Sequence, residues 1–169
     1  MLSPAWFSRV GRPLLTRERC DARALAEAFA AVVRVPIEEV RSWRTLEAVV
    51  RAEPSDDPWW DGEESERQRL WQLAAERQSE ASLAGRMAAI VDERAPPIRV
   101  AVAACAARAG GADPALLRSA VGAALLAEQQ YALAELAGVD REHHFAIKRR
   151  AFAGGRWPVG YHRGAFLYF

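Results

Sequence analysis

The sequence predicts an all-α protein: a single helical bundle of about five helices with a short C-terminal β-hairpin. Three observations predict this fold. Alanine and leucine dominate the chain from residue 21 onward, helix-starting and helix-ending residues recur along it, and residues 155–169 are instead rich in glycine and aromatic side chains. With 169 residues, 51% of them hydrophobic, the chain can bury one core without a metal or a disulfide. We expect one domain, residues 1–169, with a subdomain seam best placed at residues 53–62.

Two helices are expected before this seam. The first spans about Ala22 to Val33, because apolar residues recur there at helical spacing behind the N-cap residue Asp21. The second is expected to begin at Pro36 and to reach about Arg51, because proline suits the first position of a helix. Residues 53–62 contain two prolines among several acids, so we expect a loop there.

Three further helices are expected after the seam. A long one runs from Glu63 to about Arg94 and is ended by Pro96 and Pro97, because proline interrupts helical hydrogen bonding. The next runs from Ile98 to Ala109 and is closed by two glycines. The last begins at Pro114 and ends at Ala137, before Gly138. Because the last two helices carry few charges, both should lie centrally in the bundle.

The C-terminal residues 155–169 predict the β-hairpin. Tyr161 and the run from Phe166 to Phe169 flank a turn at His162-Arg163-Gly164. An isolated two-stranded hairpin is marginal in water, so this one must pack on the helices. The sequence is compatible both with a buried aromatic plug and with an exposed association surface.

Charge is distributed unevenly although the net charge is only +1. Residues 53–66 hold seven acidic side chains and no basic one, whereas residues 141–163 hold six basic side chains and one acidic one. Such a separation could steer a charged partner. Alternatively, the two segments lie against each other in the fold.

The leading functional hypothesis is a non-enzymatic protein-protein interaction module. Small bacterial adaptors and toxin-neutralising immunity-type proteins share its profile of modest size, uneven charge and no recognisable catalytic motif. Tryptophans rimmed by carboxylates are typical of an interface that selects a basic partner, although both could equally fold inward. The predicted partner-binding residues are Trp59, Trp60, Asp56, Asp57, Asp61, Glu63 and Glu64.

A small helical enzyme, or enzyme subunit, that acts on an anionic substrate is the alternative. Arginines beside aromatic rings could hold a phosphate or a carboxylate, and the competing interpretation is a solvated basic face. The predicted anion-binding residues are His143, His144, Arg149, Arg150, Arg156 and His162. Nucleic-acid binding through the same basic C-terminal segment is a third and less favoured hypothesis, because the net charge is close to zero.

No cofactor or metal site is predicted. Glycine-rich phosphate-binding motifs are absent, and the adjacent residues His143 and His144 would point about 100° apart on a helix, which prevents them from chelating one ion. Cys20 and Cys105 fit no metal spacing and are expected to be unpaired thiols in a reducing cytoplasm. No apolar run approaches the roughly 20 residues of a membrane helix, so no membrane partner is expected.

Overall fold

The computed structural model describes residues 22–34, 36–42, 57–108, 114–153, 158–162 and 164–168. Over these ranges the chain is mostly helical, which confirms the predicted fold class. Five helices and three strands follow one another in the order α2 (Ala22–Val33), β1 (Glu39–Ser42), α4 (Asp57–Ala75), α5 (Glu80–Arg108), α6 (Pro114–Ala137), α7 (His144–Ala153), β2 (Pro158–His162) and β3 (Ala165–Tyr168). No helix of these ranges combines the length and the hydropathy needed to cross a membrane.

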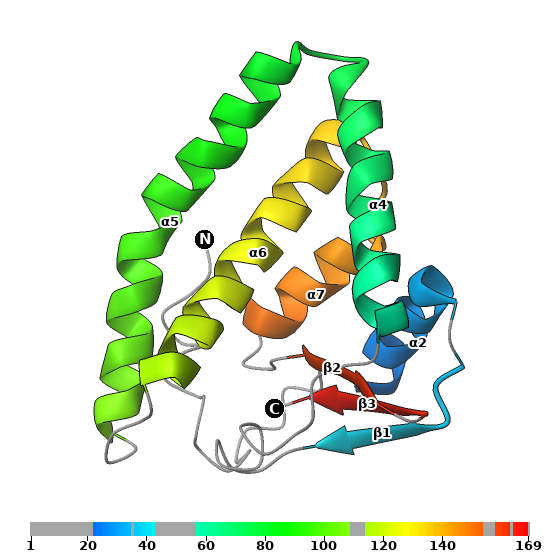
Figure 1. Cartoon of the computed structure of the whole chain (residues 1–169), viewed down its shortest axis with the longest axis vertical. Helices are drawn as coiled ribbons and strands as arrows, with labels where there is room; N and C mark the ends of the chain where they lie inside the picture. Colours follow the sequence, from blue (N-terminus) through cyan, green and yellow to red (C-terminus); the bar gives the residue numbers. More distant parts are fainter. Residues whose placement is uncertain are drawn as a thin grey trace.

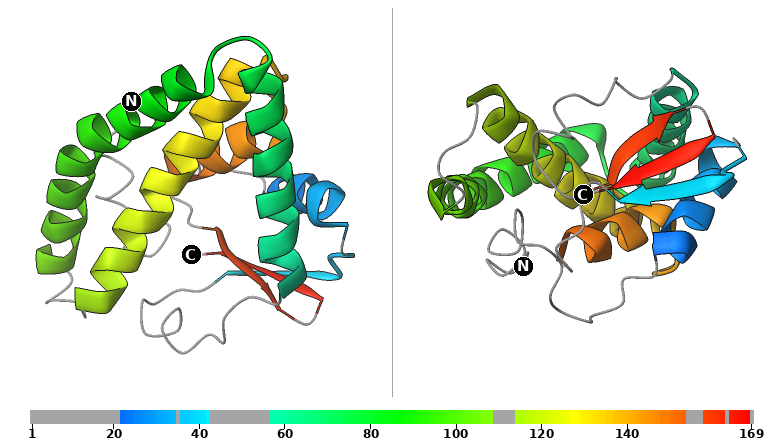
Figure 2. Two further views of the ribbon diagram at one scale, coloured as in Figure 1. Left: turned by 45° about the horizontal axis from the view of Figure 1, so that its top comes forward. Right: turned by 90° about the horizontal axis from the view of Figure 1, so that it is seen from below.

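Helix α6 is the centre of the helical part. It contacts α4, α5 and α7, while α4 and α5 diverge from their shared connection and touch little (Figure 1). Helix α2 packs against α4 and α7, and the small sheet lies below these helices, at the end of the molecule opposite the α4–α5 connection (Figure 2). The helical layer therefore has a packed side at α4 and α7 and a projecting side at α5.

Three separate groups of buried apolar residues hold these parts together. One group joins α5 to α6 and contains Ile98, Val102 and alanines of α6. A second joins α4, α5, α6 and the start of α7 around Leu70 and Phe145. The third lies between α2, α7 and the sheet and consists of Ala26, Phe29, Ala151, Tyr161 and Phe166. The sheet is thus tied to the helices by aromatic packing.

The predicted C-terminal hairpin is confirmed, and its tail is buried where the structure describes it. Strands β2 and β3 are antiparallel, and Gly164 between them has a φ of +81°, which favours glycine. Phe166 is fully buried and Tyr161 nearly so. Trp157 and Phe169 lie outside the described residues. Of the two interpretations of the C-terminal aromatic residues, a buried plug is therefore correct at Phe166.

The prediction of a helix that begins at Pro36 is wrong for its first residues. Residues 39–42 instead form strand β1, which pairs in parallel with β3, so that Val40 lies opposite Phe166. The backbone N–H groups of Glu38 and Glu39 both donate to the carbonyl of Gly164. A parallel partner more than a hundred residues away supplies these bonds, and a local helical pattern cannot reveal it. The rest of that expected helix, residues 43–51, lies outside the described residues.

The prediction of one long helix from Glu63 to Arg94 is also wrong, because two helices share this range. Helix α4 begins at Asp57, inside the expected loop of residues 53–62, and the chain leaves the helix after Ala75. Ser79 then starts α5 as an N-cap, since its Oγ accepts the N–H of Ser82 at 3.3 Å. The break lets α5 turn back along α6 instead of extending α4.

The prolines expected to end that helix lie inside α5. The helix continues through Pro96 and Pro97 to Arg108, and both prolines are exposed. The carbonyls that lose an N–H partner to a proline can then be hydrated. Ile98 and Val102 are buried in the core shared with α6, which holds the helix together across the prolines.

Helix α6 has the bounds that the sequence predicts. Gly138, with a φ of +71°, follows its last residue. The N–H of Val139 donates to the carbonyl of Ala134, and that of Gly138 donates to the carbonyl of Glu135, which is the hydrogen-bond pattern of a Schellman motif. Local chemistry alone therefore ends this helix.

Candidate functional site

A buried ion pair lies where α4, α6 and α7 meet. The Nζ of Lys148 on α7 donates to both carboxylate oxygens of Glu63 on α4, at 2.7 and 2.8 Å. The amide Nε2 of Gln130 on α6 donates to the same carboxylate at 3.2 Å. Lys148 and Glu63 are 6% and 3% exposed, and the ammonium also lies 5.8 Å from the ring centre of Phe29. One carboxylate thus connects three helices.

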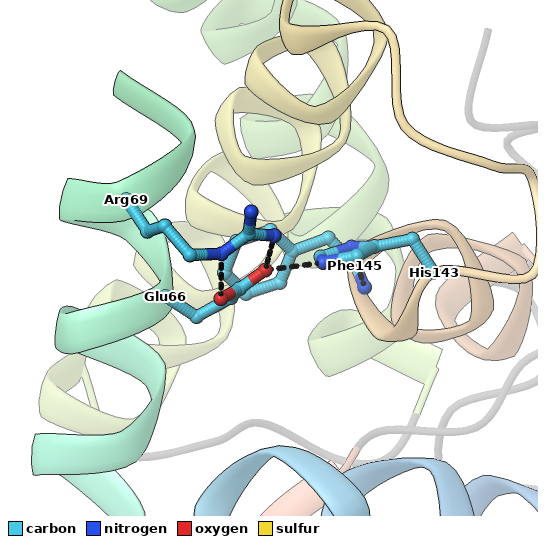
Figure 3. Close-up of polar contacts among 4 residues, drawn as sticks. All are labelled: Glu66, Arg69, His143 and Phe145. Atoms are coloured by element: carbon cyan, nitrogen blue, oxygen red, sulfur yellow. Dashed lines mark hydrogen bonds and ion pairs between the residues drawn. The ribbon is translucent and has the colours of Figure 1, made fainter. Parts of the chain in front are cut away.

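A second carboxylate, Glu66, lies one turn further along α4 and faces α7 (Figure 3). Arg69 donates two hydrogen bonds to it, at 2.7 and 2.6 Å, and the Nε2 of His143 lies 2.7 Å from its Oε1. Burial alone would raise the pKa of Glu66, but hydrogen bonds from Arg69 and His143 outweigh burial and lower that pKa. The carboxylate is held in its charged form.

The hydrogen bonds of His143 use both of its ring nitrogens. The backbone N–H of Phe145 donates to Nδ1 at 3.2 Å, so Nδ1 is an acceptor and the ring proton of the neutral form lies on Nε2, facing Glu66. A general base needs a nitrogen lone pair that a substrate can reach. His143 has none left, so the geometry favours a positioning role at the start of α7 over proton transfer.

The neighbouring His144 has a different environment. It is 3% exposed, neither ring nitrogen has a hydrogen-bond partner among the described residues, and its ring packs against Phe29 and Phe145. Burial, followed by the electrostatic influence of the neighbouring His143 and Lys148, lowers the pKa of His144 to about 3. This imidazole is therefore neutral and belongs to the interior rather than to an anion site.

Arg149 and Arg150 of the basic segment also have internal partners. The Nε of Arg149 donates to Glu128 at 3.2 Å, and its guanidinium lies 4.4 Å from the ring centre of Tyr131. Arg150 donates to the carbonyl of Arg141 and to the carboxylate of Glu142. Arg156 lies outside the described residues, and His162 is placed in β2 by its backbone alone.

The acidic and basic segments therefore lie against each other, which confirms the internal-pairing alternative at Glu63–Lys148 and at Glu66–His143. Of the described members of the predicted anion site, His143, Arg149 and Arg150 have internal partners, and His144 is buried. Binding of an anion at these residues stays a prediction.

The predicted partner-binding segment is helical where it is described. Asp57, Trp59 and Trp60 belong to the first turns of α4, with side chains outside the description, as is all of Asp56. Asp61 and Glu64 are exposed, and hydrogen bonds from Arg67 and Gln68 lower the pKa of Glu64 to about 2. Glu63, expected among the exposed acids, is instead buried against Lys148.

An apolar groove that was not predicted lies between α5 and α6. It has a volume of about 420 Å³, and Arg99 and Arg118 border it. Neither guanidinium has a carboxylate partner among the described residues. Next to Arg99, Val100 is 70% exposed. The other residues that line the groove are Val102, Ala103, Leu117, Val121 and Gly122.

Small side chains make the groove open. A Cβ added at Gly122 would meet no atom within 4 Å, so the wall of α6 has free space there. The end of α5 after Pro97 and helix α6 look apolar on almost every face, and this pattern cannot tell which of their faces pack together and which stay open. The only hint in the sequence was the isolation of Arg99 and Arg118 among apolar residues.

Comparison with protein-family models, with curated proteins and with solved structures found no match for this chain. Within the described ranges, no group of three or more His, Cys, Asp and Glu residues could hold a metal ion. The geometry of the chain's own side chains is therefore the basis for its proposed function.

Proposed function

We propose that the chain is a non-enzymatic protein-binding module and that its groove between α5 and α6 receives an acidic, amphipathic segment of another protein. The observation that carries this proposal is the pairing of an apolar groove with two bordering arginines that have no carboxylate partner among the described residues. On the profile of size and charge given above, we propose a cytoplasmic protein of the bacterial adaptor or immunity type.

The chemistry of the groove indicates what such a partner presents. Val102, Leu117 and Val121 offer apolar surface to a hydrophobic anchor, and burial of that surface stabilises the complex. Arg99 and Arg118 can each hold a carboxylate in a two-pronged hydrogen bond. Arginine is also enriched at protein interfaces, where its planar head is easily desolvated. The partner inferred from this groove is acidic, unlike the basic one expected from the tryptophan segment.

A contrast within the molecule favours protein binding over the binding of an anionic substrate. Among residues 141–150, the side chains of His143, Lys148, Arg149 and Arg150 already contact a carboxylate, a carbonyl or an aromatic ring of this chain. The arginines of the groove do not contact a carboxylate among the described residues, and they border an open apolar groove instead of an enclosed polar pocket. Such a surface fits a peptide segment better than a small polar substrate.

The test begins with site-specific cross-linking in native lysate. A photoreactive phenylalanine replaces Ala103, an exposed residue that lines the groove, and a second one replaces Ala84, exposed on α5 outside it. We expect one protein to be cross-linked from position 103 and not from position 84. That protein is then purified, and its affinity for the wild-type chain is measured by calorimetry.

Charge reversal tests whether Arg99 and Arg118 contribute to the affinity for the partner. Arg99→Glu with Arg118→Glu should weaken the affinity at least about tenfold, because carboxylates would face carboxylates. Arg86→Glu, an exposed arginine of α5 outside the groove, is the matched control and should leave the affinity unchanged. Equal affinity for all three chains, or a partner whose contact segment is basic, contradicts the proposal.

A further inference from the structure

Helix α5 has a largely apolar outer face, on the side opposite to α6 (Figure 1). The buried residues Ala95, Ile98 and Val102 mark the side of the helix that packs inward. On the other side, exposed residues recur at intervals of three or four, which places them along one face of the helix. Val100 is 70% exposed, so a large apolar side chain lies in solvent there. The residues of the outer face are Ala89, Glu93, Pro96, Val100, Ala103 and Ala107.

Two opposite charges lie on one flank of this outer face. Asp92 and Arg99 are both exposed, and neither has a salt bridge among the described residues. Because two helical turns separate them, they lie on the same side of α5 and roughly 10 Å apart along its axis, too far to pair with each other. Each charge therefore remains available to a group outside the helix.

The two prolines of α5 add backbone acceptors beside the acidic charge. Pro96 and Pro97 have no N–H, so the carbonyls of Asp92 and Glu93 lose the donor that a helix supplies four residues further on. All four of these residues are exposed. This turn thus combines carboxylates with backbone oxygens that lack a helical donor. A guanidinium, which has five N–H donors, suits such a group.

We infer that α5 pairs in antiparallel orientation with α5 of a second copy of this chain. A two-fold axis between residues 95 and 96 places Arg99 of each copy opposite Asp92 of the other, so the same ion pair forms twice. The alignment also places Ala103 against Ala88 and Ala89, whose small side chains let the helices approach closely. The charges of this surface are complementary to themselves, which is why a second copy fits it.

The dimer goes beyond the proposed partner binding and does not rest on it. Arg99 also borders the groove between α5 and α6, so a second copy and an acidic partner segment would compete for this side chain. Arg118, the other arginine of the groove, is on α6 and has no part in the pairing of α5 with α5. The two proposals can therefore be tested separately.

Sedimentation equilibrium of the full wild-type chain tests the dimer. We expect reversible dimerisation with a dissociation constant of roughly 0.1 mM, because a single pair of helices buries a small interface. Asp92→Arg and Arg99→Asp should each weaken dimerisation at least about tenfold, because like charges then face each other. Arg86→Asp, the same charge change at an exposed residue on the other flank of α5, should leave dimerisation unchanged.

A mixture of the two weakened variants gives the decisive result. The Asp92→Arg chain and the Arg99→Asp chain, mixed in equal amounts, should dimerise at least as tightly as the wild type, because opposite charges again face each other at both positions. Mixing would not reverse a merely structural effect of either substitution. A wild-type chain that stays monomeric at about 1 mM, single variants that dimerise like the wild type, or a mixture that does not recover dimerisation overturns the inference.

Arg118→Glu separates this inference from the proposed function. The substitution should weaken binding of the acidic partner and leave dimerisation unchanged. A monomeric wild-type chain would overturn the dimer alone, and a groove without an acidic partner would overturn the proposed function alone.

Discussion

The junction of α4, α6 and α7 and the projecting pair of α5 and α6 use charge in opposite ways. At the junction, Glu63 and Lys148 are buried together, and Glu66 holds both Arg69 and His143. Along the groove, Arg99 and Arg118 border an apolar surface without a carboxylate partner among the described residues. A charge in the first region is part of the fold, whereas a charge in the second is available to another molecule.

This contrast shows that a dense run of charges need not be a free surface. Glu63 and Glu66 of the acidic run pair with Lys148 and His143 of the basic run, because desolvated charges must be paired within the protein. Arg99 and Arg118 at the groove have no such partner among the described residues. If the comparison is correct, substitutions at the junction should change stability, and substitutions at the groove should change binding.

The largest effect is expected from Lys148→Ala. Its removal leaves the Glu63 carboxylate buried without its cation, which should lower the free energy of unfolding by about 3–5 kcal/mol. Urea denaturation followed by circular dichroism measures this loss. Replacing both partners, as Glu63→Met with Lys148→Met, should recover most of it, because no unpaired charge then remains.

The matched control for Lys148→Ala is Arg150→Ala, a substitution on the same helix. It breaks an exposed ion pair with Glu142, which lies just before that helix. It should cost less than about 1 kcal/mol. If the two variants are equally stable, the α4–α7 pair is not a structural element and the comparison between the two regions fails.

The second effect is a loss of stability in mild acid through His144. Its pKa is about 3 in the folded chain, below the 6.5 of a free imidazole, so the unfolded chain binds the proton more readily. The stabilisation is complete above pH 6.5 and is lost as the pH falls toward 3, by up to about 1.4 kcal/mol for each pH unit.

Replacing the imidazole with a ring that cannot be protonated checks this dependence. His144→Phe should flatten the free energy of unfolding between pH 6.5 and 4.5, as measured by urea denaturation at several pH values. Glu64, with its pKa of about 2, contributes only below pH 4.5, so Glu64→Gln should leave that window unchanged. A slope that persists in His144→Phe would place the titrating group elsewhere.

A smaller effect is expected from Glu66→Ala, at the partly exposed edge of the junction. The variant removes the acceptor of Arg69 and of His143, and hydrogen bonds to charged groups contribute about 1.5–3 kcal/mol when buried. Because Arg69 is exposed, we expect a loss of about 1–2 kcal/mol. The ring signals of His143 in NMR spectra should shift in this variant and remain in place in Glu142→Ala.

The smallest effect on stability is expected at the groove. Arg99→Glu with Arg118→Glu should change the free energy of unfolding by no more than about 0.5 kcal/mol, because neither side chain has a described ion-pair partner to lose. Thermal unfolding of the free chain measures this. A loss comparable to that of Lys148→Ala would mean that these arginines are structural. It would contradict the proposal that the groove is a docking surface.

Much of the fold could be predicted because its signals are local. Helix α2 has the predicted bounds, α6 begins at Pro114 and ends before Gly138, and the hairpin turns at Gly164 as expected. Ser79 was also a local signal, the N-cap of α5, and it was missed inside an apparently continuous pattern. Capping and turn chemistry act within four residues, so the sequence shows them directly.

The elements that were predicted wrongly depend on distant partners. Strand β1 exists because β3 offers it an edge, and α5 passes through Pro96 and Pro97 because Ile98 and Val102 are anchored on α6. Neither partner is visible in the neighbouring residues, and tertiary packing outweighs the local preference for a helix or for its end.

The sequence by itself determined the helical class, the C-terminal cap of α6, the C-terminal hairpin and the segregation of charge. Only the tertiary structure decided which charges pair with each other. Glu63 and Lys148 are 85 residues apart and meet because α4 and α7 both pack on α6, where Gln130 donates to the same carboxylate. Arg99 and Arg118 remain available because α4 diverges from α5 and leaves the groove uncovered by any described element. Burial and pairing are properties of three-dimensional contact, and residue order does not fix them.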